Sequence, residues 1–317
     1  MFSALNKFVN TIFHKSTSSI IHQPLLNKNS IEKLRHLAEK PADKMPNFHE
    51  VEHRQYGDMR SVYRGYGLDY EESRQYQAGD EIRFMNWRLS ARTDELYMKV
   101  FREERRPSVF ILIDRRSTMR FGSKTRLKVT QAARIATYMA FMAKQQNAPI
   151  GGVVLNETAE WIPESSGEAA IYNLLSQTNS PCPPLNIEDE ISLDHILRLL
   201  LNMLVRGSVI YIVSDFHDLT AESHPILLQL AEEHKVHAIN VHDSLEKQLP
   251  SVSGINIHNT DTDDDTYLDL DAGMQDQFSQ HASIHFKKIR ESFSQFNIPY
   301  IDINAERNDI DQLISTI

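Results

Sequence analysis

Two short apolar runs, each ending near an aspartate, constrain the fold of this chain more than any other feature. Residues 108–114 and 208–216 are almost wholly apolar, and they carry Asp114 and Asp215 at or beside their carboxyl ends. Short uninterrupted apolar runs of this kind are typical of strands that are buried on both faces. The sequence therefore predicts a sheet that is covered by helices on both sides.

Segments of helical and strand character alternate around these two runs. We expect helices at residues 30–40, 124–146, 188–206, 221–234 and 274–296, and further strands at 148–156, 236–241 and 298–304. A hairpin is expected on either side of the aspartate-rich run that begins at Asp261. The alternation predicts an α/β, Rossmann-like fold with a mostly parallel sheet, in which Asp114 and Asp215 meet at one sheet edge.

The chain divides into three parts by composition. Residues 1–44 are interpreted as a helical and linker segment, residues 45–107 as a β-rich elaboration, and residues 108–317 as the α/β domain. The elaboration follows no helical period and mixes arginines with acidic residues, which favours internal ion pairs over a nucleic-acid surface. Within it, Trp87 is expected to be a core anchor.

The single cysteine and the hydropathy pattern bear on the compartment. Cys182 stands in a Pro-Cys-Pro-Pro stretch, where a surface thiol is expected, and one cysteine allows no disulfide within the chain. No apolar run reaches the length of a membrane-spanning helix. We expect a cytoplasmic protein, with only the amphipathic residues 1–14 as a potential contact to a membrane surface.

The residues after Asp114 resemble the first loop of the von Willebrand A metal-ion-dependent adhesion site. That loop has the order D-x-S-x-S-M, and here Asp114, Thr118 and Met119 match it. Asp114, Thr118 and Asp215 are therefore candidate ligands of Mg²⁺, which prefers oxygen atoms. Arg116 occupies the first hydroxyl position, and a guanidinium cannot ligate a cation. We predict that Arg116 replaces the metal by pairing with both aspartates, so no cofactor is expected, with Mg²⁺ as the alternative.

A longer block of the sequence resembles the bacterial "domain of unknown function fifty-eight" family. The similarity covers roughly residues 45–270. The matching residues are Gly57, Ser61, Arg74, Tyr76, Gly79, Asp80, Arg83, Trp87, Ala91, Arg92, Thr93, Glu103, Glu104, Arg105, Asp114, Met119, Phe121, Gly122, Asp215, Asp243, Glu246 and Pro250. The resemblance implies a von Willebrand A-like domain in the bacterial cytoplasm that acts beside a MoxR-type AAA+ ATPase.

Three functions from different classes follow from these features. The first is a non-enzymatic interaction or assembly protein with a degenerate metal site, which binds its partner through the loops at 115–124, 157–167 and 216–220. The first of these loops carries Arg115, Arg116 and Arg120, so an acidic partner surface is expected. The second is an Mg²⁺-dependent adhesion-type binder. The third is a zinc hydrolase, because His49, Glu50 and His53 satisfy the H-E-x-x-H motif. No nucleic-acid partner is expected.

Overall fold

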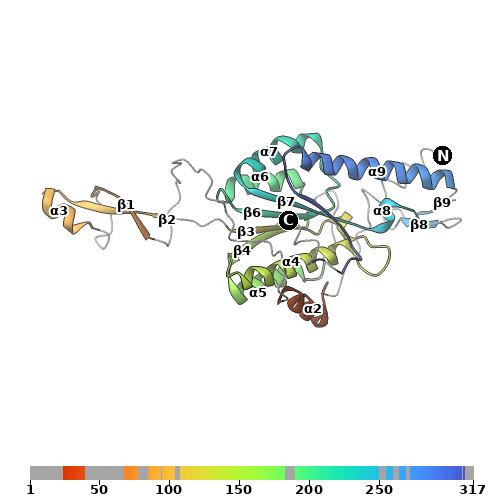
Figure 1. Cartoon of the computed structure of the whole chain (residues 1–317), viewed down its shortest axis with the longest axis horizontal. Helices are drawn as coiled ribbons and strands as arrows, with labels where there is room; N and C mark the ends of the chain where they lie inside the picture. Colours follow the sequence, from red (N-terminus) through yellow and green to blue (C-terminus); the bar gives the residue numbers. More distant parts are fainter. Residues whose placement is uncertain are drawn as a thin grey trace. The chain divides into compact units, whose positions relative to one another are not determined.

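A computed structural model describes most of the chain, and Figure 1 shows its elements. The described residues are 24–39, 68–77, 85–93, 95–103, 108–182, 190–249, 255–259, 264–268, 272–308 and 310. The chain forms two compact units: unit 1 comprises Met1–Val51 and Ser108–Ile317, and unit 2 comprises Glu52–Pro107. The amphipathic residues 1–14 and the motif residues His49, Glu50 and His53 lie outside the described residues.

Unit 1 is built on a six-stranded sheet. In spatial order the strands are β10 (Tyr300–Asn304), β7 (Lys235–His242), β6 (Val209–Ser214), β3 (Val109–Asp114), β4 (Ile150–Leu155) and β5 (Ala159–Ser165). All neighbouring pairs are parallel except β4 with β5, which is antiparallel. The predicted α/β class with a mostly parallel sheet flanked by helices is confirmed.

Helices cover both faces of this sheet because alternate strand residues point to opposite sides (Figure 1). Ile111 and Ile113 of β3 pack with α4 (Lys128–Gln145) and α5 (Gly167–Thr178), whereas Phe110 and Leu112 pack with the helices of the other face. The helices of that second face are α6 (Leu193–Met203), α7 (His224–Glu233) and α9 (Ala272–Ser294). The sheet is therefore buried on both sides, as its uninterrupted apolar strands predict.

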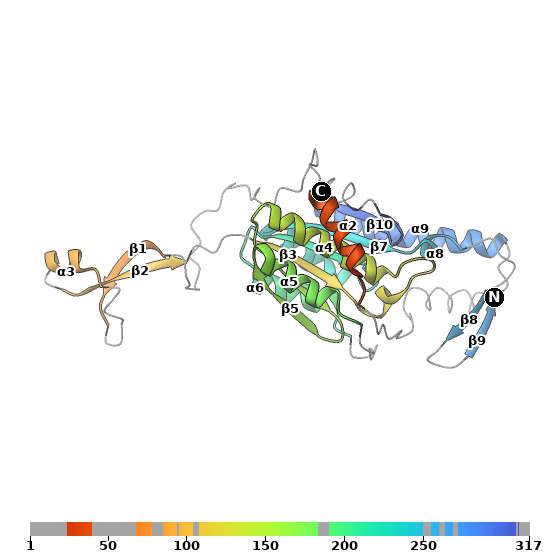
Figure 2. The same ribbon diagram turned by 90° about the horizontal axis from the view of Figure 1, so that it is seen from below.

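The N-terminal helix α2 (Lys28–Glu39) belongs to unit 1 and packs on α4 (Figure 2). Its Leu34 and Ala38 are buried in the same core cluster as the inner face of α4. The side chain of Asn179, at the end of α5, accepts a hydrogen bond from the backbone N–H of Leu26. Helix α2 is thus an integral layer of the α/β unit.

The strand order explains where a site can form. Strands β3, β4 and β5 wind outward in one direction, and β6, β7 and β10 wind outward in the other. The order reverses between β3 and β6, which pair directly from Val109 with Val209 to Ile113 with Val213. In doubly wound sheets the loops at the carboxyl ends of two such strands diverge and leave room for a site.

Two local elements differ from the sequence-based expectations, and a third is confirmed. Residues 157–167, expected as a loop, contain the edge strand β5, and helix α5 after it was not predicted. The hairpin around the aspartate-rich run is confirmed as β8 (Ile255–Asn259) paired with β9 (Asp264–Leu268). The shorter elements are the 3-10 turns η2 (Ser117–Arg120) and η4 (Ala221–Ser223) and the single-turn helix α8 (Ser244–Lys247).

The described part of unit 2 is a two-stranded antiparallel sheet with one short helix. Strand β1 (Leu68–Gln75) pairs with β2 (Tyr97–Glu103), and helix α3 (Trp87–Thr93) precedes β2. The expectation that Trp87 is a core anchor is wrong for this unit, because 63 % of Trp87 is exposed. Asp80 and Arg83, which the family resemblance also includes, lie outside the described residues.

Candidate functional site at the carboxyl edge of the sheet

The two predicted aspartates do meet at the carboxyl edge of the sheet. Asp114 is the last residue of β3, and Asp215 directly follows the neighbouring strand β6. Asp114 is fully buried and Asp215 is 8 % exposed. The Ser214 hydroxyl donates a hydrogen bond of 2.7 Å to Oδ2 of Asp114, which ties the two strand ends together.

Arg116 fills the space beside Asp114. Its Nε and backbone N–H both donate to Oδ1 of Asp114 at 3.0 Å, and its Nη2 donates to Oδ2 at 2.7 Å. On the other side, Nη1 and Nη2 donate to the two carboxylate oxygens of Asp218 at 2.6 and 3.0 Å. The guanidinium therefore bridges two carboxylates by paired hydrogen bonds while only 2 % of the residue is exposed.

The prediction for Arg116 holds for Asp114 and is wrong for Asp215. Asp218, three residues further along the loop after β6, takes the place that was assigned to Asp215. Asp218 also accepts a hydrogen bond of 3.0 Å from the backbone N–H of Leu193, at the start of α6. The loop therefore turns so that Asp218, and not Asp215, faces the guanidinium.

Asp215 pairs with a different buried cation, Lys128. The ammonium of Lys128, in the first turn of α4, lies 2.8 Å from Oδ2 of Asp215 and 2.5 Å from Oε1 of Glu246. Lys128 is 1 % exposed and Glu246 is 3 % exposed. The backbone N–H of Asp243 donates to the second oxygen of Glu246 at 2.7 Å. A second buried cation thus joins two carboxylates at the same edge.

The charges of the two bridges shift the ionisation equilibria of these groups. Burial lowers the pKa of Arg116, but Asp114 and Asp218 raise it more, so this pKa lies well above its ordinary value. Burial raises the pKa of Asp218, but Arg116 brings it below its ordinary value. Burial likewise raises the pKa of Asp215, yet Lys128 and His217 hold it well below the usual range. These shifts favour the charged forms of Arg116, Asp215 and Asp218.

The pKa of Glu246 shifts in the opposite direction from those of Asp215 and Asp218. Burial raises its pKa above the ordinary value, and the attraction of Lys128 offsets this effect only in part. Burial lowers the pKa of Lys128, but the attraction of Asp215 and Glu246 has the larger effect. The pKa therefore lies above its ordinary value, and the amine stays charged. Glu246 is thus the carboxylate of this bridge that is protonated first in acid.

Thr118 and His217 connect the two loops. Oγ1 of Thr118 lies 3.0 Å from Nδ1 of His217, and Oδ1 of Asp215 lies 3.1 Å from the same nitrogen. A hydroxyl–imidazole–carboxylate relay needs both ring nitrogens, one for each neighbour. Because both contacts fall on Nδ1, these three residues do not form such a relay. The attraction of Asp215 outweighs burial and raises the pKa of His217.

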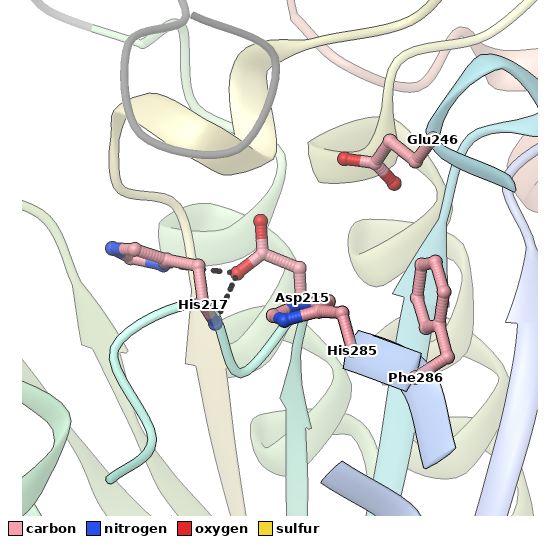
Figure 3. Close-up of a pocket in the computed structure, with 5 residues that line it drawn as sticks. All are labelled: Asp215, His217, Glu246, His285 and Phe286. Atoms are coloured by element: carbon pink, nitrogen blue, oxygen red, sulfur yellow. Dashed lines mark hydrogen bonds and ion pairs between the residues drawn. The ribbon is translucent and has the colours of Figure 1, made fainter. Parts of the chain in front are cut away.

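A small hollow opens beside this cluster (Figure 3). It is lined by Asp215, His217 and Glu246 from the edge and by His285 and Phe286 of α9. It has room for about one water molecule. Among the described residues, no group of three histidine, cysteine or acidic side chains is placed to hold a metal ion.

The candidate ligands Asp114, Thr118 and Asp215 are therefore brought to one edge but are not turned toward a common centre. Asp114 faces Arg116, Asp215 faces Lys128, and Thr118 faces His217. The buried cations occupy the coordination positions of both carboxylates, so these residues as arranged do not fit Mg²⁺.

Arg115 is directed into the protein. Its guanidinium donates to the backbone oxygens of Gln177, Ser180 and Pro181 at 2.7 to 3.1 Å, to the Ser180 hydroxyl at 2.8 Å and to Sγ of Cys182 at 3.0 Å. Arg115 is 1 % exposed, and Cys182 is likewise buried. The expectation of a surface thiol is thus wrong, because the segment after α5 folds over the guanidinium.

Arg120 is buried as well, and its Nε donates to the backbone oxygen of Arg115 at 3.3 Å. The expected basic surface formed by Arg115, Arg116 and Arg120 is therefore absent: all three guanidinium groups lie inside the described part of unit 1. The arginines of this loop serve internal hydrogen bonding, which a sequence pattern of clustered positive charge does not reveal.

A further acidic residue, Glu190, binds Ser117 in the loop that follows β3. Its carboxylate accepts hydrogen bonds of 2.6 Å from the backbone N–H and 3.1 Å from the hydroxyl of Ser117. Burial raises the pKa of Glu190 above its ordinary value despite these two donors. Sequence reasoning missed Lys128, Glu190 and Asp218 as members of the site. A signal was present only for Asp218, which follows a strand-end aspartate within the predicted edge loop.

Comparison with known proteins decides the family. The model of the family described as "Protein of unknown function DUF58" matches residues 72–288, which is more than half of the chain. The chain belongs to this family. Its relatives include the uncharacterized proteins Rv1480 of Mycobacterium tuberculosis and Mb1516 of Mycobacterium bovis. Each is 23% identical over 255 residues, which cover 80% of this chain and 80% of the relative.

Solved structures of similar proteins are more distant. BatB from Bacteroides thetaiotaomicron is 15% identical with a TM-score of 0.39, and the match covers 67% of this chain and 96% of BatB. A von Willebrand factor type A protein from Catenulispora acidiphila is 12% identical with a TM-score of 0.31, over 46% of this chain and 35% of that chain. No helix among the described residues is long and apolar enough to span a membrane.

Proposed function

We propose that this DUF58 protein is a non-enzymatic interaction or assembly protein. In this proposal the carboxyl edge of its sheet contacts a protein partner without a metal ion. The observation that carries the proposal is the Arg116 bridge, in which one buried guanidinium occupies the cation position between Asp114 and Asp218. An internal cation makes the edge independent of Mg²⁺, which an adhesion-type site needs for binding.

The edge is rigid, which suits a binding role. Asp114, Arg116 and Asp218 link the loops after β3 and β6, and Lys128 and Glu246 extend the same network to α4 and α8. Loops on such a scaffold present a surface of fixed shape to a partner. Lys124, at the end of the loop 115–124, and the following Thr125 are exposed, so we propose that the partner contacts these residues and not the buried arginines.

The proposed partner is a MoxR-type AAA+ ATPase, and the proposed compartment is the cytoplasm. The partner follows from the family resemblance of the sequence, and the single cysteine supports a reducing compartment. An Mg²⁺-dependent adhesion-type binder is the second candidate, and the internal Arg116 and Lys128 bridges argue against it. The zinc hydrolase hypothesis depends on His49, Glu50 and His53, which lie outside the described residues.

A binding assay tests this proposal. The full chain is titrated with the MoxR-type ATPase of the same host, in buffer with Mg²⁺ and in buffer with a chelator, and with the ATPase held in its nucleotide-bound form in both. The expected result is binding that does not depend on free Mg²⁺. Lys124→Glu, at the carboxyl edge, should weaken it, whereas the matched control Lys235→Glu, at the amino end of β7, should not. Absence of binding by the wild-type chain would reject the partner, and equal effects of the two substitutions would reject the edge.

A further inference from the structure

Two arginines of unit 1 meet at a neutral oxygen atom. Arg126 lies two residues before α4 begins, and Arg134 lies in the second turn of that helix. Nη2 of Arg126 and Nη1 of Arg134 donate to Oδ1 of Asn308, at 2.9 and 3.1 Å. Two guanidinium groups therefore share one amide oxygen, which carries no negative charge to offset theirs.

Hydrogen bonds to the backbone fix the place where the two arginines meet. Nη1 of Arg126 donates to the backbone oxygens of Ala305 and Arg307 at 2.9 and 3.1 Å. The side-chain amide of Gln131 donates to the same oxygen of Arg307 at 2.9 Å. These bonds hold the segment after β10 against α4. Asn308 is exposed and both arginines are partly exposed, so the meeting point can be reached from solvent.

The positive charge of this arginine pair is not neutralised within the described part of the chain. Burial and the charge of Arg126 lower the pKa of Arg134 to about 10. Burial also lowers the pKa of Arg126, and the attraction of Glu306 offsets this effect only in part, because Glu306 pairs with Lys124 at 3.5 Å. Arginine stays protonated in proteins, so the pair keeps two positive charges close together.

The pair also has N–H groups to offer. Arg134 makes its hydrogen bond through Nη1, so its Nε and Nη2 have no acceptor among the residues that the structure describes. The Nε of Arg126 has no acceptor in this part of the chain either, and its Nη2 bonds only Asn308. Adjacent N–H groups of a guanidinium match two oxygens of one oxyanion, so the free donors favour an anion over a water molecule.

The amount of positive charge selects the class of anion. A carboxylate neutralises one of the two guanidinium groups and leaves the other uncompensated. A phosphate monoester carries about 1.5 to 2 negative charges at neutral pH, together with three strong acceptor oxygens. A phosphate group therefore matches both the charge of the arginine pair and its free donors on two sides.

We propose that Arg126 and Arg134 form a binding site for a phosphate group, either inorganic phosphate or the phosphate of a monoester. Nε and Nη2 of Arg134 donate to two of its oxygens, and Nη2 of Arg126 donates to a third. The bound phosphate links the start of α4 to the segment after β10, which the two arginines already join through Asn308. The site requires neither a metal ion nor the protein partner proposed above.

Calorimetric titration of the full-length protein with inorganic phosphate tests this site. At about pH 8, where phosphate is mainly a dianion, and at constant ionic strength, one site with a dissociation constant of about 1 mM or less is expected. Acetate should bind at least about tenfold more weakly, because it neutralises only one arginine. Phenyl phosphate distinguishes the two sources: tighter binding than inorganic phosphate assigns the site to a monoester, and weaker binding assigns it to free phosphate.

Arg134→Gln is the decisive variant. Arg134 makes one hydrogen bond within the protein, so the variant should fold, and its dissociation constant for phosphate should rise at least about tenfold. Arg134→Lys should recover part of the affinity, since it keeps the charge but loses the paired N–H groups. Arg198→Gln, which removes an exposed arginine of α6, is the matched control and should bind phosphate like the wild type.

A further variant tests whether the chain's own carboxylates occupy the arginine pair. Asp309 and Asp311 follow Asn308 closely in the sequence. The double variant Asp309→Asn/Asp311→Asn should bind phosphate within about twofold of the wild type. Phosphate binding that appears only in this variant overturns the proposal. So does a wild-type chain that binds no phosphate at about 20 mM, that binds acetate equally well, or that binds phosphate no better than Arg134→Gln does.

Discussion

Arg116 and Asp218 are 102 positions apart in the chain, yet both oxygens of the Asp218 carboxylate accept hydrogen bonds from the Arg116 guanidinium, at 2.6 and 3.0 Å. The same guanidinium holds Asp114 on its other side. One buried cation therefore fixes the loops that follow two neighbouring parallel strands, β3 and β6. The site is organised around this side chain.

Replacement of Arg116 by methionine should destabilise the protein strongly. It leaves Asp114 and Asp218 buried without a cation, and removal of one member of a buried ion pair costs about 3–5 kcal/mol. Urea denaturation at neutral pH measures this loss of unfolding free energy. Adding Asp218→Asn to the same chain should recover part of it, because one uncompensated charge is removed. A double variant that is less stable than Arg116→Met would contradict the pairing.

Lys128→Met should make stability depend on pH in the opposite direction from the wild type. In the wild type the pKa of Asp215 is depressed, so its contribution is present above the ordinary carboxyl pKa and is lost as the pH falls through the folded value. In the variant, Asp215 and Glu246 stay buried without Lys128, so protonation favours folding. The loss should be about 3–5 kcal/mol at pH 7 and smaller near pH 5.

Denaturation of both proteins at these two pH values checks this result, with Lys144→Met as the control. Lys144 also pairs with a glutamate, Glu168, but that pair is exposed to solvent, so its removal should leave the stability almost unchanged at either pH. A Lys128→Met cost that does not shrink in acid would show that the ammonium does not neutralise the two carboxylates.

Arg115→Ala should expose the single cysteine. The guanidinium holds the last turn of α5 by one backbone carbonyl and the segment after it by two, and it lies 3.0 Å from Sγ of Cys182. Without these bonds the segment opens more often, and the unfolding free energy should fall by about 2 kcal/mol or more. The rate of Cys182 modification by a thiol reagent reports this opening at one site, and Arg198→Ala is the exposed control. An unchanged rate in Arg115→Ala would mean that other contacts close the segment.

The parts of the fold that the sequence predicted are those with strong hydrophobic patterns. Strands β3 and β6 are apolar up to their last residues, and these two apolar runs alone predict that Asp114 and Asp215 lie at one edge of the sheet. Strand β5 was missed because it is an antiparallel edge strand with Pro163 and three glutamates within or beside it, a composition more typical of a loop. Helix α5 follows it without an apolar face as marked as that of α6.

The sequence predicted that an arginine pairs with carboxylates at this edge, but it identified only one of the two carboxylates, Asp114, correctly. Arg116 was expected to neutralise carboxylates, and it does, but the loop path that selects Asp218 over Asp215 is a tertiary property. Lys128 was overlooked because a lysine in the first helical turn is usually solvated, whereas here it is nearly fully buried between Asp215 and Glu246. Arg115 and Arg120 were assigned to the surface on the same statistical ground and are buried.

The magnesium dependence of thermal stability tests the central claim, that Arg116 stands in for a metal ion, most directly. The melting temperatures of the wild type, Arg116→Ser and Arg116→Leu are compared at increasing Mg²⁺ concentration. The wild type and Arg116→Leu should not respond. Arg116→Ser supplies a hydroxyl beside Asp114 and Asp218, so it should start with a lower melting temperature and regain about 2–3 kcal/mol of stability at saturating Mg²⁺. A wild-type chain that is itself stabilised by Mg²⁺, and that loses this response in Asp114→Asn, would contradict the account.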